Sequence, residues 1–158
     1  MIEAALAWLE TSPPAEALAA SRYVYPLVNA AHILGLATLF GSILALDLRL
    51  LGLWRSIPAR PLAVALPRVA ASGLALAAAT GFLLFTVEPL DYAGNTAFLA
   101  KVSLVALGTL HAVSVHFGAA WKAFVRDGAA IGWRLRTSAV LSIALWTTAI
   151  IAGRLIAF

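Results

Sequence analysis

Four long windows, each holding at most one charged residue, divide this chain of 158 residues and constrain its fold more than any other feature. Each is close to the roughly 20 residues that an α-helix needs to cross about 30 Å of hydrocarbon. Strands of a membrane β-barrel alternate between apolar and polar residues, and these continuous apolar runs do not, so they predict helices. We therefore expect an all-α fold, an integral membrane four-transmembrane-helix bundle. The expected spans are residues 23–46, 65–87, 98–121 and 137–156.

Composition supports a membrane protein and excludes several chemistries. Hydrophobic residues make up 63% of the chain and charged residues 11%, against about 25% charged residues in soluble domains. A soluble domain of this size could not bury so much apolar surface. The absence of cysteine excludes disulfides, zinc–thiolate sites, iron–sulfur clusters and cysteine nucleophiles. Neither a glycine-rich phosphate loop nor a hydrolase-like order of Ser, His and acid is found, so no catalytic residue is predicted.

Basic residues predict the orientation of the bundle. The first and third connections, with the adjoining helix ends, carry eight basic and two acidic residues, whereas the opposite side carries three basic and five acidic ones. The positive-inside rule then places both termini outside, on the periplasmic side of a bacterial inner (plasma) membrane. Anionic lipid at the inner leaflet accounts for the basicity of the chain, and no nucleic-acid partner is predicted.

The first 20 residues differ from the rest of the chain. Residues 1–20 carry three glutamates and no basic residue, with apolar positions at helical spacing that end before Pro13 and Pro14. They predict a short amphipathic helix on the outer membrane surface, followed by a single four-helix transmembrane domain over residues 21–158.

Three histidines are the most specific functional signal. His32 lies in the first span, and His111 and His116 lie in the third. Ionisable residues inside a membrane are costly and usually functional. His32 and His111 each follow the outer basic boundary of their span by ten residues, which predicts similar depths of about 15 Å. His116 points about 140° away from His111 around the helix.

Small residues around these positions predict space for a flat cofactor. Gly35 and Gly108 lie one turn from His32 and His111, and Ala78 and Ala144 are expected at the same depth in spans two and four. We therefore predict one haem b between His32 and His111, with His116 as the second choice of ligand. Asn29 and Thr80 are expected to support the ligating histidines through hydrogen bonds.

The predicted function is that of a b-type cytochrome-like electron carrier rather than an enzyme. Its partners would be the bilayer, a quinone and a periplasmic redox protein, in a homo-oligomer or a larger membrane complex. Two alternatives remain open. The histidines could line a path for copper or another metal ion, with His32, His111 and His116 as ligands, although the chain has a single methionine as soft-ligand support. They could also serve only helix packing in a cofactor-free accessory subunit.

Asp47 is the acidic residue closest to the interior of a predicted span. It lies at the inner end of the first span, with Arg49 two residues further along the chain. We expect it to form a salt bridge with Arg49, Arg134 or Arg136.

The sequence also resembles a family of small bacterial four-span integral membrane proteins of unknown function. The resemblance rests on residues 25–35 (YPLVNAAHILG), 47–52 (DLRLLG), 80–85 (TGFLLF) and 95–101 (NTAFLAK). It implies that a histidine at the position of His116 accompanies the one at His32, whereas the position of His111 is often an amide. In architecture alone the chain is similar to small b-type membrane cytochromes and to copper-resistance membrane proteins.

Overall fold

The computed structural model describes residues 1–156, which form eight helices and no strand. Four of the helices are long and apolar enough to cross a membrane, which confirms a helical bundle of four candidate spans. These four are α3 (Val24–Leu51), α4 (Ala59–Phe85), α6 (Thr96–Phe117) and α8 (Trp133–Leu155). The shorter helices are α1 (Ile2–Glu10), α2 (Pro13–Ala20), α5 (Pro89–Gly94) and α7 (Ala119–Asp127).

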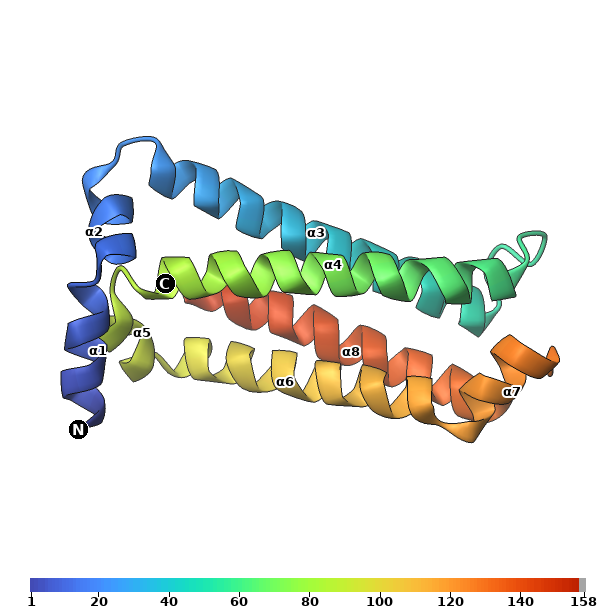
Figure 1. Ribbon diagram of the computed structural model, residues 1–158. Helices are drawn as coiled ribbons and strands as arrows, with labels where there is room; N and C mark the ends of the chain where they lie inside the picture. The colour runs from blue at the N-terminus through green and yellow to red at the C-terminus, as the bar shows by residue number, and fades with distance from the viewer. Residues whose placement is uncertain (157–158) are drawn as a thin grey trace.

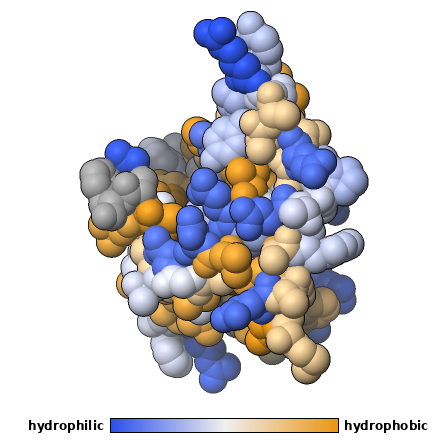
Figure 2. Space-filling view, turned by 90° about the vertical axis from the view of Figure 1, so that its left-hand side faces the viewer, coloured by the Kyte–Doolittle hydropathy of each residue, from blue (hydrophilic) through white to orange (hydrophobic). Residues whose placement is uncertain are grey.

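The short helices lie at the two ends of the bundle (Figure 1). Helices α1, α2 and α5 lie at one end, together with the end of α8, whereas α7 and the connection from α3 to α4 lie at the other. The end that carries α1, α2 and α5 presents hydrophilic residues among apolar ones (Figure 2). The proline break expected after α1 is present, and Pro13 and Pro14 also begin α2, where their missing N–H groups need no partner.

Each of the four spans has one boundary that differs by four residues or more from the sequence-based prediction: α3 ends at Leu51, α4 begins at Ala59, α6 ends at Phe117 and α8 begins at Trp133. The third span ends at Phe117 rather than at residue 121, because Gly118 adopts an extended conformation and α7 begins after it. The second span begins at Ala59 rather than at residue 65 and so also includes Arg60, because a charge marks the end of an apolar window and does not stop a helix.

The four long helices pack side by side in the order α4, α3, α8 and α6, and they do not close into a ring. Helix α3 packs against α4 and α8, and α8 packs against α6. Over residues 1–156, the backbones of α4 and α6 do not approach each other in this way, so this side of the bundle is the most loosely packed.

Glycines allow the closest of these contacts. A Cβ added at Gly35 would lie 2.7 Å from the backbone nitrogen of Ala77, and one at Gly73 would lie 2.6 Å from that of Leu39. Real Cβ atoms do not approach backbone so closely, so α3 and α4 can pack at this distance only with glycine at both positions.

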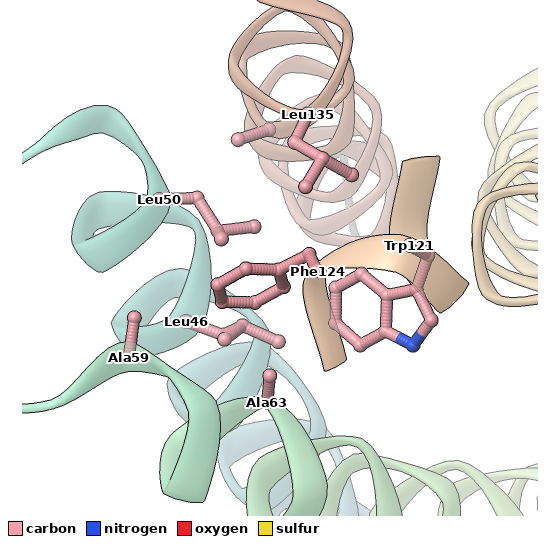
Figure 3. Packing of buried hydrophobic residues seen from close by; sticks show 8 residues of the cluster. Leu46, Leu50, Ala59, Ala63, Trp121, Phe124 and Leu135 are labelled. Carbon is pink, nitrogen blue, oxygen red and sulfur yellow. The ribbon is translucent and has the colours of Figure 1, made fainter. Parts of the chain in front are cut away.

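Helix α7 closes one end of the bundle. Its buried side chains, Trp121 and Phe124, point between the ends of α3, α4 and α8 (Figure 3). The guanidinium group of Arg60 donates hydrogen bonds to the carbonyl oxygens of Val125 and Arg126, which fastens the end of α7 to the start of α4. The third connection is therefore a structured cap. The buried residues of this cluster are Leu46, Leu50, Ala59, Ala63, Trp121, Phe124, Leu135 and Ala139.

Candidate functional site: a cavity beside α7

His32 lies between α3 and α4. Its Nδ1 atom is 2.9 Å from the carbonyl oxygen of Ala77 and 3.1 Å from the hydroxyl oxygen of Thr80. A carbonyl oxygen only accepts, so Nδ1–H donates to Ala77. The ring also packs on Gly81, where an added Cβ would lie 2.9 Å from Cε1 of the imidazole. Thr80 is thus a partner of His32, whereas Asn29 is exposed and has no hydrogen bond to it.

His111 lies at a different interface, between α6 and α8. Its Nε2 atom is 3.1 Å from both the carbonyl and the hydroxyl oxygen of Ser138. Ser138 is the sixth residue of α8 from the α7 end, whereas Thr80 is the sixth-last residue of α4 at the opposite end. His32 and His111 therefore lie in opposite halves of the bundle. The structure does not bring them together at a common depth.

The small residues expected around a haem are used in other ways. Gly35 is covered by the backbone of α4, and Gly108 is covered by the indole ring of Trp146, 3.0 Å from an added Cβ. Ala78 and Ala144 are exposed on the outside of the bundle. The residues present therefore do not fit a haem between His32 and His111, because the two imidazoles lie at different depths and the glycines beside them are covered by neighbouring helices.

A cavity of about 290 Å³ lies in the half of the bundle next to α7. Its walls come from α3, α4, α6 and α8, and Trp121 of α7 contributes to the lining. Its volume is close to the lower end of the range of about 300–1,000 Å³ for small-molecule sites, and most of its lining is apolar, as in such sites. The polar lining residues are Ser42, Asp47, Thr109, His111, His116, Ser138, Ser142 and the two tryptophans, Trp121 and Trp146.

Three residues of this cavity carry buried polar atoms without a hydrogen-bond partner. The atoms are Oδ2 of Asp47, Nε2 of His116 and Nε1 of Trp146, and no other buried side-chain nitrogen or oxygen of residues 1–156 lacks a partner. Asp47 is only 6% exposed and Trp146 only 4%. An unpaired buried polar group costs roughly 1–3 kcal/mol, so these three residues weaken the packing of the bundle around the cavity.

The imidazole of His116 is held in a defined orientation. Its Nδ1 atom donates to the carbonyl oxygen of Ala112 at 2.7 Å, and its ring packs on Trp121 with 4.4 Å between centroids. In the neutral ring, donation from Nδ1 leaves the lone pair on Nε2. His116 therefore presents a hydrogen-bond acceptor at Nε2.

The prediction that Asp47 forms a salt bridge is wrong. Oδ2 of Asp47 has no hydrogen-bond partner, and the side-chain partner of its carboxyl group is the hydroxyl of Ser142 on α8. Arg49 turns the other way, and its Nε donates to the carbonyl oxygen of Ile57 at 2.6 Å. Successive side chains of a helix point in different directions, and a separation of two residues places Asp47 and Arg49 on different faces.

A metal site is not formed by the histidines and carboxylates. Across the described residues, 1–156, no group of three or more His, Cys, Asp or Glu side chains could hold a metal ion. His111 and His116 both line the cavity, and His32 does not.

Sequence reasoning did not connect Asp47, Trp121 and Trp146 with a site. A signal was present for Asp47, because it follows Leu39, Ser42 and Leu46 on one helical face that is buried in the structure. The inward position of Trp121 depends on the turn at Gly118.

Comparison with known proteins identifies no relative of this chain. No protein-family model matches the chain, and no match is found among curated proteins or solved structures. The resemblance to small four-span membrane proteins stays a prediction, and any functional interpretation rests on the cavity.

Proposed function

We propose that this chain is a multi-pass membrane protein that binds a small, membrane-soluble molecule in the cavity beside α7. The observation that carries the proposal is a cavity of about 290 Å³ whose lining is largely apolar and includes a few polar side chains, among them Asp47, His111 and His116. An apolar body and a few polar groups are the features that such a lining would recognise. In this proposal the protein is a binding protein or carrier, and no catalytic residue is assigned.

The loosely packed side of the bundle supports entry of the ligand from the bilayer. The cavity is lined by residues of α4 and α6, the two helices whose backbones do not approach each other closely. Three of its lining residues, Ala71 of α4 and Val113 and Phe117 of α6, are exposed on that side. A lipid-soluble molecule would therefore reach the cavity without crossing the polar ends of the helices.

The distribution of charge supports a bacterial inner membrane, with α7 on the cytoplasmic side. Basic residues are concentrated on α7 and the connection from α3 to α4, at the end of the bundle where the cavity lies. The cavity would then lie in the cytoplasmic half of the bilayer, and α1 would lie at the periplasmic surface. Electron transfer through a haem remains a prediction from the histidine positions, and the geometry favours the cavity over it.

Binding of 4-fluorophenol tests this function. The protein in nanodiscs should broaden the ¹⁹F resonance of this small ring-bearing alcohol, and Ala71→Leu should abolish the specific broadening by filling the cavity mouth. Ala78→Leu is the matched control, because Ala78 is also exposed on α4 but does not line the cavity. Equal binding by Ala71→Leu, Ala78→Leu and the parent protein would contradict the proposal.

A further inference from the structure

We infer that a surface hollow at the basic end of the bundle binds the headgroup of an anionic phospholipid. The hollow has a volume of about 930 Å³ and is lined by the start of α4, the end of α7 and the connection that follows α7. It shares no lining residue with the cavity beside α7, so this inference does not depend on the ligand of that cavity. We call it the arginine hollow, and its lining includes Arg49, Arg60, Val64, Gly128 and Ile131.

The two arginines of this hollow carry charges that no carboxylate balances. Nε of Arg49 donates to the carbonyl oxygen of Ile57 at 2.6 Å. Nε and Nη2 of Arg60 donate to the carbonyl oxygen of Val125 at 3.2 and 2.7 Å. Within residues 1–156 neither guanidinium group forms an ion pair, and no acidic residue lines the hollow. Backbone carbonyl oxygens therefore hold both groups in place, and their positive charges remain available to an anion.

Arg60 keeps N–H groups for a ligand. Its hydrogen bonds to α7 use only Nε and Nη2, and a guanidinium group has two further N–H groups on Nη1. This Nη1 atom lies beside Gly128, where an added Cβ would be 3.2 Å away. Gly128 has a φ of +74°, so glycine both allows the turn that ends α7 and leaves the space beside Nη1 without a side chain. A phosphate oxygen in that space would accept from Nη1.

The arginine hollow lies at the depth of lipid headgroups. Arg49 is the third-last residue of α3 and Arg60 is the second residue of α4, so both lie where the spans end. That end of the bundle carries most of the basic residues of the chain, and in the proposed orientation it meets the anionic inner leaflet. Basic pockets between helices on the cytoplasmic side are typical binding sites for anionic headgroups.

The apolar part of the lining favours a lipid over a free phosphate ion. Val64 lies one turn from Arg60 along α4, is 44% exposed and lines the hollow together with Ile131. An acyl chain that starts from a phosphate beside Arg60 would cover these side chains, whereas a free anion would gain nothing from them. A zwitterionic headgroup brings its own cation toward the two arginines, so the charge of the hollow favours an anionic one.

Native mass spectrometry of the protein in detergent tests this site, because it counts bound lipids and gives a Kd for each. Dioleoyl phosphatidylglycerol should bind at least about fivefold more tightly than dioleoyl phosphatidylcholine, which has the same acyl chains. Arg60→Gln should remove most of that preference. Arg126→Gln is the matched control, because it removes the same charge from the same end of the bundle and Arg126 does not line the hollow.

A second pair of variants leaves both arginines in place. Gly128→Asp puts a carboxylate beside Nη1 of Arg60 and should also remove most of the preference for phosphatidylglycerol. Gly132→Asp adds the same charge four residues further along the chain and should keep the preference. Gly132 does not line the hollow, and a Cβ added there meets nothing within 4 Å.

Three results would overturn the inference. The first is equal affinity for the two lipids. The second is a preference that Gly128→Asp leaves unchanged, since a loss in Arg60→Gln alone would reflect the loosened contact between α4 and α7. The third is displacement of phosphatidylglycerol by a large excess of glycerol phosphate, which would indicate a site for free phosphate. None of these results bears on the binding of 4-fluorophenol in the cavity beside α7.

Discussion

At the scale of single residues, this protein keeps polar groups in positions that weaken its fold. Asp47, His116 and Trp146 each bury an atom that no protein group satisfies. His32 and His111, by contrast, have their bonded ring nitrogens paired with α4 and α8. The two sets of residues therefore differ: His32 and His111 join neighbouring helices through hydrogen bonds, whereas each residue of the other set keeps one buried atom unpaired.

Asp47→Leu should stabilise the protein without ligand. Leucine removes the unpaired carboxylate oxygen and extends into the neighbouring cavity, so the gain should be of the order of 1–3 kcal/mol. The measurement is the thermal unfolding midpoint in detergent, which should rise. Asp127→Leu is the control on the exposed end of α7 and should change little. A lower midpoint for Asp47→Leu would show that the carboxylate has a stabilising partner.

The positions of the histidines along the chain were predictable from the sequence, but most of their surroundings were not. The histidines were correctly identified as lying within the spans, and Thr80 as a neighbour of His32. Their facing partners were not predictable, because a count along each helix depends on an assumed starting depth and gives no rotation about the helix axis. Gly35 and Gly108 illustrate this: both were expected to leave space, and both are covered by protein.

At the scale of helices, the apolar windows determined the four spans, and local backbone geometry determined their ends. A hydrocarbon-length run with few charges has one stable solution, so the existence of α3, α4, α6 and α8 was predictable. The separation of α7 from α6 was not, because the apolar character continues through Gly118 and only its extended backbone ends the helix. That turn allows Trp121 to line the cavity.

The α3–α4 contact should depend on glycine at specific positions. Gly35→Ala places a Cβ against the backbone of Ala77 and should destabilise the protein by about 1–3 kcal/mol, as overpacking does. Gly41→Ala, on the same helix, meets nothing within 4 Å and should be neutral or slightly stabilising. Unfolding midpoints of the two variants, measured in the same detergent, provide the comparison. Similar midpoints would mean that the two helices can separate at no cost.

At the scale of the whole molecule, the loosely packed side between α4 and α6 and the cap formed by α7 define how the cavity is reached. Helix α7 contributes Trp121 to the lining of the cavity, and in our proposal the ligand enters from the bilayer between α4 and α6. The direction of this arrangement across the membrane follows from charge. Because the basic residues gather at the α7 end, that end should face the cytoplasm.

Single cysteines can test this orientation, since the chain contains none of its own. In intact cells whose outer membrane admits a charged maleimide, Glu3→Cys on α1 should react, whereas Arg55→Cys, between α3 and α4, should react only after lysis. Both positions are exposed, so a difference in labelling reports the side of the membrane rather than burial. The reverse pattern would place α7 outside, and the cavity would then lie in the outer half of the bilayer.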